Sequence, residues 1–284
     1  MNVDSTNTTS LRVAALRSAG AAFVVSLGLF AAGHAPVEAL GAGLSAWLLV
    51  FALFAPLGPA LAAAGLSLAA GILGRVHLCF WGAKPIALRP EEAAALGLTL
   101  GHVDLSDAWR RLRASATGRW WTAFSASLVA STLWSFTRYD AGAILPGTLY
   151  LVRWLAFGSV LLAAQRFVDK GGSPEGLVRP ILQAGLLLSL MGLLQRALLP
   201  DMSQLRAVLP QLEKAMLDPH EGRLVSTVLD PNLLGAMLAG IAALLLARLL
   251  AGSVDGTRRT LAAWALVVLA IVLTVSRGSM LALA

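Results

Sequence analysis

Residues 231–250 read PNLLGAMLAGIAALLLARLL, and this stretch decides the class of fold. It holds 20 residues and carries no charged side chain before Arg248. A helix of that length extends about 30 Å, which is the thickness of the hydrocarbon core of a bilayer. The stretch therefore predicts a transmembrane helix.

Other apolar runs of comparable character lie along the whole chain. Hydrocarbon offers no hydrogen-bond partners to an open backbone, and the runs lack the alternating pattern of a membrane barrel. The sequence therefore predicts an all-α, polytopic integral membrane helix bundle with about eight or nine transmembrane helices. The predicted helices cover residues 19–33, 39–55, 60–74, 120–136, 146–164, 177–199, 231–250 and 261–275.

The composition excludes several classes of protein. Hydrophobic residues make up 57% of the chain and charged residues 13%, whereas ordinary soluble domains have about 25% charged residues. Disordered chains are polar and rich in charge, and a disulfide scaffold needs more than the single Cys79. The net charge of +7 does not predict nucleic-acid binding, because the basic residues lie in the connections between the apolar runs.

The basic residues cluster in alternate connections, which predicts the orientation in the membrane. Segments 110–119, 166–179 and 248–259 are rich in Arg and are assigned to the cytoplasm. The external loop at about 200–230 carries three basic and five acidic residues, as an outward segment should. Residues 1–18 are then a cytoplasmic tail, and residues 19–284 form the transmembrane domain.

The first third of the chain needs one more crossing to bring residues 110–119 inside. Residues 91–109 supply it if they form a weak fourth span, giving nine spans in total, which we favour. Alternatively, residues 41–74, which Pro56 and Pro59 interrupt, form a re-entrant hairpin. Asp104 and Asp107 make 91–109 a poor span, so an amphipathic helix at the membrane surface is a third interpretation.

Arginines near the outer face are the most informative polar residues. We find no motif for a nucleotide, a metal or any other cofactor, and the predicted chemistry uses none. An ionised side chain within a membrane is costly and by default predicts a function or a partner. Guanidinium groups bind phosphate through paired hydrogen bonds, although Arg196 and Arg277 could instead extend to lipid headgroups. The candidates are Arg153, which we place about 10 Å into its span, Arg196, Arg223 and Arg277.

Asp230-Pro231-Asn232 is a strong signal for the start of a helix. The Asp side chain can cap the helix and do nothing more. Alternatively, the free N–H groups of an outward helix N-terminus can bind an anion, which Arg223 lies close enough in sequence to share. Both interpretations remain open at this point.

The ordered combination of these residues resembles the O-antigen ligase and polysaccharide polymerase family. It consists of Arg223, then Asp230-Pro231-Asn232-Leu233-Leu234-Gly235 opening an apolar helix, a basic loop, and Leu273-Thr274-Val275-Ser276-Arg277-Gly278 closing the next helix. The match covers residues 223–284, and the rest of the chain agrees only in hydropathy.

The resemblance implies a glycosyltransferase of lipopolysaccharide or polysaccharide biosynthesis in the bacterial inner membrane. Its partners would be an undecaprenyl-pyrophosphate-linked glycan donor, membrane lipids, and a sugar acceptor such as the lipid A core or a growing polysaccharide. Arg223 and Arg277 would hold the pyrophosphate, with Asn232 in the matching Pro-Asn motif.

The family's general-base histidine lies in a later periplasmic loop. It would fall beyond Ala284, so we expect a C-terminally truncated chain that is inactive alone. A transporter or channel for an anionic solute is the alternative, and a structural membrane subunit is a third possibility.

Overall fold

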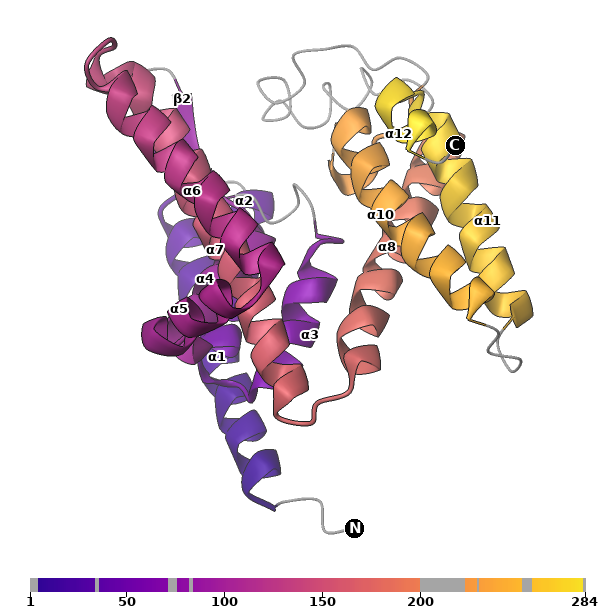
Figure 1. Ribbon diagram of the computed structural model, residues 1–284, viewed down its shortest axis with the longest axis horizontal. Helices are drawn as coiled ribbons and strands as arrows, with labels where there is room; N and C mark the ends of the chain where they lie inside the picture. Colours follow the sequence, from indigo (N-terminus) through magenta and orange to yellow (C-terminus); the bar gives the residue numbers. More distant parts are fainter. Residues whose placement is uncertain are drawn as a thin grey trace. The chain divides into compact units, whose positions relative to one another are not determined.

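The structure is a computed structural model that describes residues 5–33, 36–70, 76–81, 84–199, 223–228, 230–251 and 257–282. Within these residues, the regular structure is helical apart from one two-stranded hairpin, so the predicted all-α class is confirmed. Five of the helices are long and apolar enough to cross a membrane. The chain divides into two compact units, shown in Figure 1 and described separately below.

Unit 1 comprises Met1–Ser67 and Leu73–Leu177, and unit 2 comprises Leu68–Ile72 and Val178–Ala284. The elements of unit 1 are α1 (Ser5–Ala31), α2 (Pro36–Phe54), α3 (Leu57–Ser67), β1 (Val76–Trp81), β2 (Lys84–Leu88), α4 (Pro90–His102), α5 (Leu105–Ala114), α6 (Ala116–Ser135) and α7 (Ala141–Asp169). Unit 2 contains most of α8 (Pro174–Leu198), η3 (Ser226–Val228), α10 (Pro231–Leu250), α11 (Thr257–Thr274) and α12 (Arg277–Leu281).

In the first third of the chain, two of the predicted helices have different bounds in the structure. Helix α1 begins at Ser5, so residues 5–18 are helical and continuous with the apolar run that follows them. Helix α3 ends at Ser67 after 11 residues, and its length of about 16 Å is too short to cross a bilayer. An antiparallel hairpin follows, in which Val76 pairs with Leu88 and Trp81 with Lys84.

Residues 91–109 do not form the single span that we favoured. Helix α4 ends at His102, and Asp104 then caps α5 by accepting a hydrogen bond from the Ser106 N–H group. Seven of the 13 residues of α4 are buried, so α4 is an internal helix of about 20 Å. Helix α5 carries charged residues on one side, so only α5 fits the interpretation as a surface helix.

Helix α4 nevertheless runs parallel to α2 and α7, as the predicted topology requires of residues 91–109. Gly97 and Gly101 approach the backbone at Leu49 and Leu53 of α2, so α4 and α2 are parallel. Helices α4 and α7 are parallel as well, because later residues of α4 contact later residues of α7. The paired residues are Glu92 with Arg153, Thr99 with Ser159, and His102 with Arg166.

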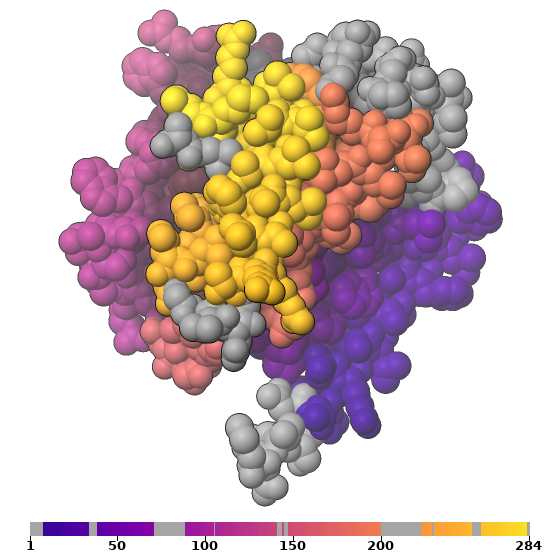
Figure 2. All heavy atoms as spheres, turned by 90° about the vertical axis from the view of Figure 1, so that its right-hand side faces the viewer, coloured from indigo at the N-terminus to yellow at the C-terminus, as the bar shows by residue number. Residues whose placement is uncertain are grey.

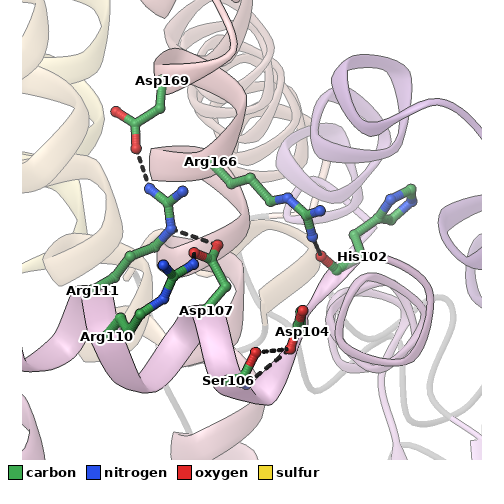
Figure 3. A network of polar contacts seen from close by, with 8 residues as sticks. All are labelled: His102, Asp104, Ser106, Asp107, Arg110, Arg111, Arg166 and Asp169. Carbon is green, nitrogen blue, oxygen red and sulfur yellow. Dashed lines mark hydrogen bonds and ion pairs between the residues drawn. The ribbon is translucent and has the colours of Figure 1, made fainter.

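A polar network joins α5 to the end of α7 (Figure 3). Arg111 donates to Asp107 at 2.7 Å and also pairs with Asp169. The hydrogen bond from Arg111 holds the pKa of Asp107 below its ordinary value, so this pair persists into mildly acidic solution. Arg166 donates to the His102 carbonyl at 2.7 Å. Two of the basic connections assigned to the cytoplasm therefore meet at one end of unit 1.

Unit 2 is built on α8, α10 and α11, which share an apolar core that includes Leu188, Leu238 and Ile271. Gly185 of α8 faces Ile241 of α10, while Gly192 faces Leu224, so the two helices run in opposite directions. Apolar side chains of α11 and α10, including Leu269 and Leu250, are exposed. Figure 2 shows the side of the molecule on which these two helices lie, in yellow and orange. A protein that is apolar on its outside as well as in its core suits a lipid environment.

Gly235 lets α10 and α12 pack closely. A Cβ atom at this position would lie 2.9 Å from Ser279 Cβ and 3.0 Å from Thr274 Oγ1. We predict that Gly235→Ala lowers the free energy of unfolding in detergent by about 1–3 kcal/mol, because the added carbon overpacks this junction. Thermal loss of helical circular dichroism measures the change.

Gly240→Ala is the matched control on the same helix. Nothing lies within 4 Å of a Cβ atom at Gly240, so the variant should be as stable as the parent or more stable by up to about 1 kcal/mol. Equal unfolding temperatures for the two variants would contradict the close packing of α10 on α12.

Candidate functional site

Arg223 lies at the centre of the candidate site. Its Nε atom donates to the Thr274 carbonyl oxygen at 2.8 Å, and one Nη atom donates to Asn232 Oδ1 at 3.0 Å. A guanidinium carries five N–H groups, so these two bonds fix its plane, and the other three or so N–H groups have no partner among the described residues. Both acceptors are neutral, and the side chain is only half-buried. Arg223 is therefore oriented while its positive charge is retained.

The start of α10 supplies Asn232 but no free N–H groups. Asp230 Oδ1 accepts from the N–H groups of Asn232 at 2.8 Å and Leu233 at 3.0 Å. The Asp230 carbonyl accepts from Leu234 at 2.9 Å, and Pro231 has no N–H group. The interpretation of Asp230 as a cap is therefore confirmed. The idea that this N-terminus offers free N–H groups to an anion is wrong, because the N–H groups of Asn232, Leu233 and Leu234 are all bonded to Asp230.

Two tight turns bring the acceptors to Arg223. Val275 has φ of 53° and Ser226 has φ of 52°, a left-handed conformation that is rare for residues other than Gly. The turn at Val275 presents the Thr274 carbonyl and is followed by Ser276, which caps α12. The turn at Ser226 is held by a hydrogen bond from its hydroxyl to the Leu188 carbonyl at 2.8 Å. Strained turns that are fixed by their surroundings are common at functional sites.

The two segments that carried the family resemblance form one packed structure. The N–H group of Leu224, next to Arg223, donates to the Leu273 carbonyl at 2.9 Å, beside the bond from Arg223 to Thr274. Gly235 then packs α10 against α12. The order of these residues in the sequence therefore has a local structural reason, independent of any resemblance.

Arg277 and Arg196 lie at the same end of unit 2. Arg277 is the first residue of α12, is exposed, and forms no ion pair or hydrogen bond with the described residues. Arg196 lies one turn beyond Gly192, which faces Leu224, and is half-buried. Arg223 is therefore hydrogen-bonded to Asn232, and Arg277 and Arg196 lie at the same end of unit 2.

Arg153 has a different environment in unit 1. Its Nε atom lies 2.7 Å from Glu92 Oε1, and its guanidinium lies 5.4 Å from the centre of the Tyr150 ring. Glu92 Oε2 accepts from the Arg89 N–H group at 3.0 Å, so both carboxylate oxygens are used. Sequence reasoning missed Glu92, although an acidic pair at Glu91 and Glu92 in an apolar segment was the available signal. The charge of Arg153 is thus balanced within unit 1.

Comparison with models of known families, with curated proteins and with solved structures found no match to this chain. Among the described residues, no group of three or more His, Cys, Asp and Glu side chains could hold a metal ion. Most of the predicted external loop, residues 200–222, lies outside the described residues. Among the described residues, Arg223 and its two acceptors are the arrangement best suited to hold an anion.

The pairing of Arg153 with Glu92 predicts a structural role. The two side chains are 28% and 10% exposed, so Arg153→Met would leave a nearly buried carboxylate without its partner. We expect a loss of about 2 kcal/mol in the free energy of unfolding, which is less than for a fully buried pair. Thermal unfolding in detergent measures it.

The double variant Glu92→Gln/Arg153→Met is the control, because it removes both charges. It should be more stable than the single Arg153→Met variant, since no unpaired carboxylate remains. A double variant no more stable than the single variant would argue against the ion pair.

Proposed function

We propose that this chain belongs to a membrane glycosyltransferase that uses undecaprenyl-pyrophosphate-linked glycan as its donor. The acceptor is a sugar on the periplasmic face, as in an O-antigen ligase or a polysaccharide polymerase. One observation supports this proposal above the others: Arg223 is held by two neutral acceptors at an end of unit 2 that the charge pattern predicts to face outward.

The chemistry of the acceptors separates Arg223 from Arg153. A carboxylate such as Glu92 cancels the charge of the arginine that it orients. The Thr274 carbonyl and the Asn232 amide orient Arg223 and leave the charge to attract an anion. A phosphate group fits the remaining N–H groups, because guanidinium and phosphate form paired, charge-assisted hydrogen bonds.

Arg277 adds a second positive charge at the same helix ends. In the proposed transfer, an acceptor hydroxyl gives its proton to a general base, which in the resembled family is a histidine of a later periplasmic loop, and its oxygen bonds to the anomeric carbon of the donor sugar. The bond from that carbon to the pyrophosphate oxygen breaks, and its electron pair leaves with the lipid-linked pyrophosphate. A cation beside the departing oxygens stabilises this developing charge, and Arg223, which its two acceptors hold in place, does so without reorganisation.

The first test is donor binding by purified protein in detergent. Arg223→Ala and Arg277→Ala should each weaken binding of undecaprenyl pyrophosphate by about tenfold or more, because each removes charge-assisted hydrogen bonds to phosphate. Native mass spectrometry across a lipid titration measures the affinity.

Arg259→Ala is the matched control, because Arg259 is an exposed arginine at the opposite end of α11. It should bind the lipid pyrophosphate like the parent. If both Arg223→Ala and Arg277→Ala also bind like the parent, the proposed donor site is wrong.

The second test separates orientation of Arg223 from its charge. Asn232→Asp keeps an acceptor for Arg223 but adds a carboxylate, so the fold should be as stable as that of the parent or more stable. Binding of undecaprenyl pyrophosphate should nevertheless fall further than in Asn232→Ala, because the new carboxylate competes with phosphate for Arg223. Stability and affinity are measured on the same samples.

A purely structural role for Arg223 predicts the reverse order for these two variants. Asn232→Asp would then retain donor binding and Asn232→Ala would lose it together with stability. That result would contradict the proposed function.

A further inference from the structure

We propose that the corner between α5 and α6 binds the phosphate headgroup of an anionic phospholipid. The corner comprises Trp109, Arg113, Arg119 and Trp120. It lies in unit 1 and does not depend on the proposed glycan transfer.

The sequence folds into a sharp corner here. Ser115 ends α5 and also caps α6, where its hydroxyl accepts from the Gly118 N–H group at 2.9 Å. Gly118 is buried, and a Cβ atom there would lie 2.7 Å from Leu112 Cα, so the first turn of α6 packs directly on α5. This packing brings together two arginines that are separated by a helix boundary.

Arg113 and Arg119 retain their charges at this corner. Arg119 donates to the Arg113 carbonyl at 3.3 Å, so the two residues are adjacent. The Arg113 guanidinium lies 4.3 Å from the centre of the Trp109 ring, which orients it without neutralising it. Neither arginine pairs with a carboxylate in the described part of the chain.

The neighbouring arginines, Arg110 and Arg111, already pair with carboxylates. Arg110 lies 2.9 Å from Asp107, while Arg111 bonds both Asp107 and Asp169 (Figure 3). Arg110 and Arg111 therefore pair with the acidic side chains of α5 and of the end of α7, Asp107 and Asp169. The charge left at the corner is that of Arg113 and Arg119, and it complements an anionic phosphate.

Two exposed tryptophans indicate that this phosphate belongs to a lipid. Trp109, whose ring contacts Arg113, is 45% exposed, and Trp120, which follows Arg119 in the sequence, is 78% exposed. Trp side chains concentrate at the level of the headgroups, where the ring contacts acyl chains and the indole N–H group contacts polar groups. Trp121, by contrast, stacks on Trp154 of α7 with ring centres 6.2 Å apart, so α6 directs adjacent tryptophans to different surroundings. Two arginines without carboxylate partners among the described residues, accompanied by two exposed tryptophans, suit a phosphatidylglycerol headgroup.

The test compares lipid binding by three forms of the purified protein. The probe is phosphatidylglycerol, with phosphatidylcholine as the neutral lipid, and native mass spectrometry measures the lipid retained in each case. Arg113→Gln/Arg119→Gln should lower the preference for phosphatidylglycerol by about thirtyfold, from about fivefold for each arginine near an anionic surface. Both side chains are exposed, so elution volume and helical circular dichroism should match the parent.

Arg258→Gln/Arg259→Gln is the matched control. It removes the same charge from two exposed arginines at the start of α11, in another connection that is predicted to be cytoplasmic. This control should keep most of the preference for phosphatidylglycerol. An equal loss in both double variants would show a general effect of charge and overturn the proposed site, as would an unchanged preference in Arg113→Gln/Arg119→Gln.

Discussion

A positive charge in apolar surroundings needs a partner, and the chemistry of that partner decides what the charge can do. Arg153 is paired with the carboxylate of Glu92 and is thereby neutralised. Arg223 is held by a carbonyl and an amide, which fix its direction and preserve its charge. Two arginines that look equivalent in the sequence therefore have different capacities. The first contributes to packing in unit 1, and the second keeps a charge that we propose attracts an anion.

Much of the architecture of unit 2 supports the two acceptors of Arg223. The Thr274 carbonyl is presented by a left-handed turn at Val275, and Asn232 is placed by the Asp230 cap of α10. Gly235 permits the close contact that brings these segments together. The helix N-terminus contributes position rather than N–H donors, because its donors are already used. Several uncharged residues accompany one arginine because they position it rather than add charge.

The long apolar helices could be predicted from sequence because length and hydropathy are local properties. The start of α10 was predicted correctly at Pro231, since Asp230 and Pro231 form a strong capping signal. Hydropathy was less informative about the start of α1, because the helix begins at Ser5, in polar residues that precede its apolar residues. It also missed the break between α4 and α5, and the hairpin at β1 and β2, where pairing between separate segments decides the structure.

Within the candidate site, the sequence predicted the residue types but not all of their partners. Arg223 was predicted from its place near the outer face and Asn232 from the family resemblance, whereas the Thr274 carbonyl is a backbone group that residue identity does not reveal. Glu92 was overlooked as the partner of Arg153 because the two lie far apart along the chain. A structure of the protein with undecaprenyl pyrophosphate bound, determined by electron cryo-microscopy, would show where the pyrophosphate lies. We expect phosphate density within hydrogen-bonding distance of the Arg223 guanidinium, and phosphate density beside Arg153 instead would contradict the proposed donor site.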